Sequence, residues 1–239
     1  MLSSKIKAVI LCGGRGTRLG EITDKIPKPL VKIDGKPILW HIMRIYSHYN
    51  INNFVLCLGY KGQMIKDYFS SMDDWNITFA ETGLNTGTAA RVLKIKEHID
   101  DQFFLTYGDG IADVDISKLL HFHDSHGKIG TVTAVRPLVR FGMLDLDGSR
   151  VSSFSKYSIP SQGWIDGGFF VFNRNIFNYL RSIDKNEMLE GKTLENLSHD
   201  EELMAFRHEG YWKCIDTNRD LLSVTKDIET GNDKWRVWK

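Results

Sequence analysis

Short apolar runs alternate with amphipathic stretches through the first half of this 239-residue chain. The apolar runs cover residues 8–11, 54–58, 77–80 and 103–106, and the stretches predict helices over 38–49, over 63–69 and from 116 to a stop at Gly127. Strands that alternate with helices form βαβ units, in which each helix crosses over to a parallel strand. The pattern therefore predicts a mainly parallel sheet covered by helices.

The second half has a different texture. Short strand-like runs cover residues 131–135, 144–147, 151–154, 168–172 and 203–207, and they are followed by a segment over 211–215 and a helix over 218–228. This pattern favours antiparallel or mixed pairing. We find no repeat or linker, so the sequence predicts one α/β domain over residues 1–239, with a decorated C-terminal half.

Composition points to small anionic ligands. The apolar fraction of 42% is enough to bury a core without disulfides. A formal net charge of +1 lacks the basic excess of nucleic-acid-binding proteins, so no nucleic acid partner is expected. Three widely spaced cysteines, Cys12, Cys57 and Cys214, favour a reducing compartment. No apolar run approaches the roughly 20 residues that span a bilayer, so we expect a cytoplasmic protein without a membrane partner.

A glycine-rich turn follows the first apolar run, in the sequence Leu11-Cys12-Gly13-Gly14-Arg15-Gly16-Thr17-Arg18-Leu19. Its glycines allow backbone N–H groups to approach a phosphate that a Cβ atom would keep away. Leu19 stands where a dinucleotide-binding fingerprint needs its last glycine, and no Gly-Lys-Ser/Thr follows to make a Walker loop. The turn predicts a phosphate cradle, with an ordinary tight turn as the alternative.

Two cations lie near this turn in the sequence. Lys28 is flanked by Pro27 and Pro29, and because proline restricts both itself and the residue before it, Lys28 is expected on a stiff extended segment. An ammonium on a braced backbone is pre-organised for a phosphate, whereas a flexible one is not. Arg18 adds a planar guanidinium suited to the outer phosphates. The alternative for Lys28 is an ordinary solvated loop lysine.

Two aspartates at the ends of apolar segments predict a magnesium site. Asp109 follows the buried run over 103–106, and Asp216 follows the segment over 211–215. Magnesium takes one or two protein carboxylates and completes its coordination shell with water and substrate phosphates. Taken singly, each aspartate also fits a turn or cap residue.

Other candidate groups have simpler interpretations. His121, His123 and His126 are predicted on a solvated helix surface, because positions i and i+2 do not share a helix face. No Ser/His/Asp arrangement has a signature spacing, so covalent catalysis lacks support. A phosphate monoester would need no general base to attack, because its second pKa of about 6 leaves it dianionic at neutral pH. These points favour transfer to a phosphate ester by alignment and charge neutralisation.

The chain resembles the sugar-phosphate nucleotidyltransferases, and among them the glucose-1-phosphate cytidylyltransferases. The general signature is Gly13-Gly14-x-Gly16-Thr17-Arg18-Leu19 followed by Pro27-Lys28-Pro29. The subgroup resemblance covers nearly the whole chain, through Lys36-Pro-Ile-Leu-Trp-His-Ile-Met43, Gly59-Tyr-Lys-Gly62, Thr106-Tyr-Gly-Asp-Gly110, Arg140-Phe-Gly142, Gly167-Gly-Phe-Phe-Val171, Glu202-Leu-Met-Ala-Phe206, Gly210-Tyr-Trp212 and Asp216-Thr217. It implies a Rossmann-like, mixed and mainly parallel sheet flanked by helices, with a small antiparallel appendage. It also implies a nucleotide-binding half over about 1–130 and an acceptor-binding half over about 131–239.

The resemblance further implies transfer of CMP from CTP to a sugar 1-phosphate or similar small phosphate ester, with release of pyrophosphate. Mg²⁺ would be held by Asp109 and Asp216, and the catalytic set would be Arg18, Lys28 and Asp109. The implied nucleotide-binding residues are Leu11, Cys12, Gly13, Gly14, Gly16, Thr17, Arg18, Lys28, Thr86, Gly87, Thr88, Gly108 and Asp109. The implied acceptor-binding residues are Gly142, Lys156, Asp166 and Gly167.

The chain departs from the family pattern at the acceptor. Family members carry Glu-Lys-Pro where this chain reads Lys156-Tyr157-Ser158, so the carboxylate that binds sugar hydroxyls is missing, and Asp166 replaces a usual Asn. The segment between Phe69 and Trp75 is shorter than in the glucose enzymes, which leaves a homo-oligomer open. Two alternatives stay open: the same chemistry with UTP, dTTP or GTP, and a non-catalytic nucleotide-binding regulatory module.

Overall fold

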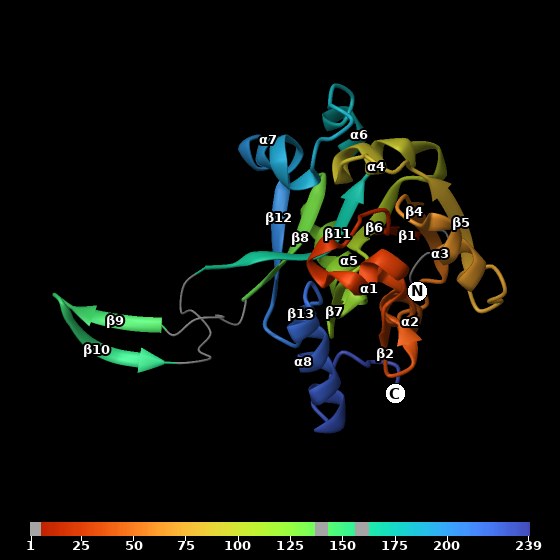
Figure 1. The fold of residues 1–239 in the computed structure, drawn as a ribbon. Coiled ribbons are helices and arrows are strands. Elements are labelled where there is room, and N and C mark those ends of the chain that lie inside the picture. Colours follow the sequence, from red (N-terminus) through yellow and green to blue (C-terminus); the bar gives the residue numbers. More distant parts are fainter. Residues whose placement is uncertain (1–5, 137–142, 156–162) are drawn as a thin grey trace.

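The computed structural model describes residues 6–136, 143–155 and 163–239. Its centre is a seven-stranded sheet in the order β12-β8-β11-β6-β1-β4-β5 (Figure 1). The strands are β1 (Lys7–Leu11), β4 (Asn53–Leu58), β5 (Asn76–Glu81), β6 (Gln102–Tyr107), β8 (Gly130–Val135), β11 (Ile165–Asn173) and β12 (Leu203–His208). All run parallel except β11, which is antiparallel to both of its neighbours, β6 and β8. The predicted mixed, mainly parallel sheet is confirmed.

Helices cover both faces of this sheet. Buried residues of α2 (Ile38–His48), α3 (Gly62–Phe69), α5 (Ile116–His126) and α8 (Asn218–Glu229) join one hydrophobic cluster, and those of α4 (Thr88–Lys94), α6 (Ile176–Tyr179) and α7 (Leu194–His199) join the other. Along β1, Ala8 and Ile10 belong to the first cluster and Val9 and Leu11 to the second, because successive strand side chains point to opposite faces. A strand buried on both faces has no polar alternation, which is why the run over residues 8–11 in β1 is wholly apolar.

Three small antiparallel pairs complete the described part of the fold. They are β2 (Lys32–Ile33) with β3 (Lys36–Pro37), β7 (Gly110–Ala112) with β13 (Trp212–Cys214), and β9 (Met143–Asp147) with β10 (Arg150–Ser155). The β9–β10 pair stands to one side of the large sheet and is the predicted appendage (Figure 1). The β7–β13 pair lies beside the carboxyl end of β6, where it helps to build the site.

Short helices were missed, whereas the long ones were predicted to within one residue of their observed ends. The C-terminus of α5 was predicted from Gly127, whose left-handed φ of 65° ends the helix. The missed elements α1 (Glu21–Lys25), α4, α6 and α7 span only 4 to 7 residues each. Segments of that length carry at most two turns of periodic pattern, so packing against the sheet decides their structure.

The prediction of a solvated helix surface is wrong for His123. His121 is exposed, but His123 is only 3% exposed and its Nδ1 lies 2.9 Å from Thr131 Oγ1 of β8. His126 Nε2 lies 2.8 Å from the same hydroxyl. Positions i and i+3 do share a helix face, so His123 and His126 together face the sheet.

Buried histidines are expected to make the fold sensitive to acid. Burial lowers the pKa of both His41 and His123 from 6.5 to about 4. The unfolded chain therefore binds more protons between these values, and the free energy of unfolding must fall as the pH drops through that window. We expect urea denaturation at a series of pH values to show this loss, with a smaller slope in His41→Gln and His123→Gln. His121→Gln is the exposed control, and an unchanged slope in both buried variants would contradict the assignment.

Candidate active site

The glycine-rich turn leaves the carboxyl end of β1 and enters a short 3-10 helix, η1 (Thr17–Leu19). Gly16 has a left-handed φ of 65°, and a Cβ atom there would lie 2.8 Å from the Cβ of Lys28. A Cβ built on Gly14 would meet no atom of the described residues within 4 Å. The turn therefore combines a glycine that shapes the backbone with one whose backbone is open to a ligand, as a phosphate cradle requires.

A buried arginine, absent from the predicted site, holds this turn in place. Arg91 of α4 is 3% exposed and donates to the carbonyl oxygens of Gly13 at 3.0 Å and Leu58 at 3.1 Å, and to Thr82 Oγ1 at 2.5 Å. A Cβ atom on Gly13 would overlap the guanidinium at 2.0 Å, which explains the glycine. Burial lowers the pKa of Arg91. The only signal in the sequence was a charged residue inside the apolar run of a short helix.

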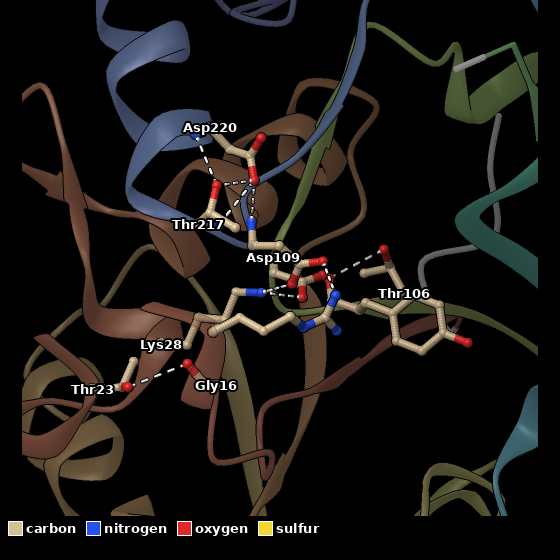
Figure 2. Close-up of polar contacts among 10 residues, drawn as sticks. Gly16, Thr23, Lys28, Thr106, Asp109, Thr217 and Asp220 are labelled. Atoms are coloured by element: carbon tan, nitrogen blue, oxygen red, sulfur yellow. Dashed lines mark hydrogen bonds and ion pairs between the residues drawn. The ribbon is translucent and has the colours of Figure 1, made fainter. Parts of the chain in front are cut away.

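Lys28 joins two carboxylates from distant parts of the chain. Its Nζ lies 2.6 Å from Asp109 Oδ2 and 2.6 Å from Asp216 Oδ1. Figure 2 shows the ammonium reaching the carboxylate of Asp109. Arg18 makes a further contact, with Nη1 2.5 Å from Asp216 Oδ2. The Lys28 side chain is 9% exposed and that of Arg18 is 73% exposed, so the lysine is fixed by packing and the arginine has room to follow a ligand.

The backbone at Lys28 differs from the prediction. Ile26 is extended as expected, with φ −130° and ψ 148°, but Lys28 begins a 3-10 turn, η2 (Lys28–Leu30). The turn closes through N–H groups of Leu30 and Val31, which donate to the carbonyl oxygens of Pro27 and Lys28. Neither bond uses the nitrogen of proline, so the flanking prolines tolerate the turn. Lys28 is nevertheless pre-organised, because its stem is buried.

Pairing of β7 with β13 brings the two aspartates together. Asp109 lies between β6 and β7, and Asp216 follows β13. In the β7–β13 register Cys214 lies opposite Gly110, and the N–H of Ile215 donates to the Asp109 carbonyl oxygen at 2.9 Å. Main-chain bonds therefore set the separation of two residues that are far apart in the sequence.

The start of α8 fixes Asp216 from the other side. Thr217 and Asp220 form a capping box, in which the Thr217 hydroxyl accepts from the Asp220 N–H and Asp220 Oδ2 accepts from the Thr217 N–H at 2.9 Å (Figure 2). The same Oδ2 accepts the Asp216 N–H at 3.1 Å. The cap that begins the helix thus orients the backbone of the site residue before it.

Lys28 and Asp216 stabilise each other in their charged forms. Burial acts to raise the pKa of Asp216, but hydrogen bonding to Lys28 and the charges of Lys28 and Arg18 lower it. The pKa of Lys28 is raised by both carboxylates against the opposing effect of burial. Asp109, Cys214 and Asp216 each offer a ligand atom, and these atoms lie within 4.8 Å of one another. Two carboxylates that already surround one cation fit a hard dication such as Mg²⁺. The neighbouring thiol of Cys214 was not predicted as part of the site.

The predicted acceptor residues are described only in part. Asp166 and Gly167 lie at the start of β11, where Asp166 Oδ1 accepts the Gly168 N–H at 2.6 Å and Trp212 Nε1 donates to the Gly167 carbonyl at 2.7 Å. Desolvation in the cleft raises the pKa of Asp166 to about 6, with the charge of Glu190 adding to the effect and the Gly168 N–H opposing it. Gly142 and Lys156 lie outside the described residues.

The predicted Thr86-Gly87-Thr88 turn forms the N-terminus of α4. Gly87 donates its N–H to the Lys185 carbonyl at 2.8 Å, and a Cβ atom on Gly87 would lie 2.0 Å from the Glu187 carbonyl oxygen. Gly87 therefore serves close packing against the segment before α7. The hydroxyl of Thr88 donates to Glu190 Oε2 at 3.1 Å, and Glu190 lines the cleft of the site.

One cleft of about 930 Å³ collects these groups. The predicted residues that line it are Leu11, Cys12, Gly13, Gly14, Gly16, Thr17, Arg18, Lys28, Thr86, Thr88, Gly108, Asp109, Asp166, Gly167 and Asp216. Gly87 is not among the lining residues of the described chain. The lining also includes residues that were not predicted, chiefly Arg91, Tyr107, Met188, Glu190, Trp212, Lys213, Cys214 and Arg219.

In the part of the chain that the structure describes, no helix is both long and apolar enough to cross a membrane.

A glycine-rich turn open to a ligand, a fixed ammonium and two carboxylates suited to a metal ion lie together in one cleft beside the carboxyl ends of β1 and β6. This combination is typical of a class of protein, the α/β enzymes that act on nucleotide phosphates. Charge neutralisation around phosphates is the chemistry that such a set supplies.

Comparison with known proteins identifies the family. Residues 7–231 match the nucleotidyl transferase family. A probable glucose-1-phosphate cytidylyltransferase of Bacillus subtilis is 44% identical over 256 residues, covering 98% of this chain and 100% of the relative. The glucose-1-phosphate cytidylyltransferase of Salmonella typhi is 40% identical over 260 residues, with the same shares of 98% and 100%. The chain belongs to the nucleotidyl transferase family and is a nucleotidyltransferase, as the resemblance in the sequence predicted.

Solved structures support the fold. HddC from Yersinia pseudotuberculosis superposes with a TM-score of 0.71 at 24% identity, covering 93% of this chain and 99% of that one. At this identity the likeness concerns the architecture of the sheet and its helices.

Arg91 is expected to stabilise the fold through the acceptors it satisfies. Arg91→Met would remove three buried hydrogen bonds, to oxygens of Gly13, Leu58 and Thr82, and we expect the free energy of unfolding to fall by about 3 kcal/mol, roughly 1 kcal/mol for each bond. Chemical denaturation measures this loss. Lys94→Met, an exposed residue of the same helix with one such bond, is the matched control and should cost less than about 1.5 kcal/mol. An equal loss of unfolding free energy in the two variants would contradict the assignment of a larger stabilising role to Arg91.

Proposed function

We propose that this nucleotidyltransferase transfers CMP from CTP to a sugar 1-phosphate or a similar small phosphate ester and releases pyrophosphate. The observation that carries the proposal is the buried ammonium of Lys28 between Asp109 and Asp216, in one cleft with the glycine-rich turn. The glucose-1-phosphate cytidylyltransferases to which the chain is similar support CMP as the transferred group and a sugar 1-phosphate as the acceptor.

In this proposal the chain aligns and neutralises two anions. Backbone N–H groups of the glycine-rich turn and the guanidinium of Arg18 bind the outer phosphates of the triphosphate. Lys28 lies at the α-phosphate in a fixed position. The acceptor's phosphate is largely dianionic at neutral pH and attacks the α-phosphorus directly, while the bond from that phosphorus to pyrophosphate breaks. No side chain has to remove a proton, which agrees with the lack of a nucleophile–base pair at signature spacing in the sequence.

Asp109 and Asp216 would hold Mg²⁺, which when bound supplies positive charge to the phosphates during transfer. The same oxygens are occupied by the ammonium of Lys28, so the lysine and a dication compete for them. We therefore expect Mg²⁺ to bind weakly alone and more tightly with the triphosphate, whose oxygens complete the coordination shell.

We further propose that residues 1–130 bind the nucleotide and that residues 131–239 complete the acceptor end. The base would lie against the backbone of residues 11–13 and the turn over 86–88, both of which contribute lining residues to the cleft. The same chemistry with UTP, dTTP or GTP is the alternative, because the preference for cytosine rests on the relatives. A cytoplasmic location and a homo-oligomer stay predictions.

A panel of substrates tests the proposal. Pyrophosphate release is measured with CTP, UTP, dTTP and GTP, each paired with several sugar 1-phosphates and other small phosphate esters. We expect Mg²⁺-dependent release with the highest kcat/KM for CTP and a sugar 1-phosphate. A higher kcat/KM with another triphosphate would establish that base instead. Triphosphate binding without release from any pair would identify a non-catalytic regulatory module.

Lys28 is expected to act in turnover and not in metal binding. Lys28→Met should lower kcat by about two to three orders of magnitude, because a pre-organised charge at the transferred phosphorus is lost. Mn²⁺ binding, followed by electron paramagnetic resonance, should persist or strengthen since the competing ammonium is gone. Lys25→Met, an exposed lysine in the same stretch of chain, is the control. Near-normal turnover in Lys28→Met would exclude Lys28 from the catalytic set.

A further inference from the structure

Two sets of polar groups in the cleft differ in character. Beside the glycine-rich turn, cationic side chains pair with Asp109 and Asp216. Elsewhere in the same cleft stands a second pair of carboxylates, Glu190 and Asp166, whose hydrogen-bond donors are all uncharged. Within the described part of the chain, neither of them forms an ion pair. Without a paired cation, this second pair of carboxylates is unsuited to contact a phosphate directly, since like charges repel.

Glu190 is held from two sides as an oriented acceptor. Tyr107 Oη donates to Oε1 at 2.5 Å, and Thr88 Oγ1 donates to Oε2 at 3.1 Å. Thr88 Oγ1 itself accepts the Leu189 N–H at 2.7 Å, which directs its proton toward the carboxylate. Leu189 is fully buried, so the backbone next to Glu190 is anchored in the core. Each carboxylate oxygen can accept two bonds and takes one from the described residues, which leaves a second acceptor position on each for a ligand.

Glu190 is connected, through Tyr107, to the end of the cleft that holds Asp109. Tyr107 ends β6, two residues before Asp109, the proposed metal ligand, so its hydroxyl links this end of the sheet to Glu190. Asp166 lines the same cleft and lies close enough for the charge of Glu190 to add to the desolvation that raises its pKa to about 6. In the proposed reaction the acceptor's phosphate attacks the α-phosphorus beside Lys28, and we place the remaining part of the acceptor among the oxygens of Glu190 and Asp166 in the same cleft.

Oxygens of this kind select a narrow class of molecule. Ionised carboxylates accept hydrogen bonds and donate none, so they suit hydroxyl groups and disfavour a second phosphate or a carboxylate on the acceptor. We infer that Glu190 is the specificity-determining residue that binds the acceptor's hydroxyl groups, and that the acceptor is a polyhydroxylated phosphate ester with no other anionic group. This assignment rests on the proposed function and supplies, from a different segment of the chain, the hydroxyl-binding carboxylate that the Lys156-Tyr157-Ser158 sequence lacks.

The test is a comparison of acceptor and donor kinetics. Wild-type enzyme, Glu190→Gln and Glu195→Gln are assayed for pyrophosphate release with CTP and Mg²⁺, using glucose 1-phosphate, its singly deoxygenated analogues and a sugar bisphosphate as probes. Glu195 is the matched control, because it is an exposed residue of α7 that does not line the cleft. Circular dichroism and thermal melting establish that each variant is folded.

We expect Glu190→Gln to raise the KM for glucose 1-phosphate by about 10- to 100-fold while the KM for CTP changes by less than about 2-fold. The wild type should disfavour at least one deoxygenated analogue by a similar factor, and Glu190→Gln should lose that discrimination. Glu195→Gln should match the wild type. The bisphosphate should be a poor acceptor for the wild type.

Several results would overturn the assignment. An unchanged acceptor KM, or a rise in the KM for CTP alone, would move Glu190 out of the acceptor site while leaving the proposed function intact. A preference of the wild type for the bisphosphate would refute the class of acceptor. Wild-type enzyme that releases no pyrophosphate with any triphosphate and glucose 1-phosphate would overturn the proposed acceptor class and this assignment together.

Discussion

The site depends on one electrostatic contact, the ammonium of Lys28 between the carboxylates of Asp109 and Asp216. Without a cation the two carboxylates would repel each other at this distance, and burial would make the repulsion stronger. Main-chain hydrogen bonds hold the two aspartates in place against this repulsion, through the β7–β13 pair and the cap of α8. An arrangement that already accommodates one cation between two acids is suited to exchange it for a dication and substrate phosphates.

The parallel sheet explains why these groups meet. Strands that run in one direction end at one edge, so the glycine-rich turn after β1 and Asp109 after β6 are neighbours across a single strand pair. Arg91 locks that turn to the adjacent strand by donating to Gly13 and Leu58. The antiparallel strand β11 then places Asp166 in the same cleft. In the proposed reaction, the cations for phosphate and the carboxylates for hydroxyl groups occupy separate parts of one cavity.

The sequence predicted the sheet and the long helices well because burial on both faces of a strand, or along one helix face, leaves a period that can be read directly. It predicted Lys28, Arg18, Asp109 and Asp216 as a set, and the structure brings all four together. It was wrong about the backbone of Lys28 and about the burial of His123. At Lys28, hydrogen bonds within residues 27–31 close a 3-10 turn that the flanking prolines tolerate, and at His123 the contact with Thr131 of β8 decided the burial.

By itself, the sequence determined the periodic elements, the glycine positions that a tight phosphate-binding turn needs, and the residue types available for phosphate chemistry. Only the tertiary structure decided which polar groups meet. Arg91 and Glu190 come from short segments without a periodic signal, and their importance lies in partners far away in the chain. A side chain's hydrogen-bond partners and desolvation are properties of three-dimensional neighbours, which no local pattern encodes, so these two residues could be found only once the sheet had brought its ends together.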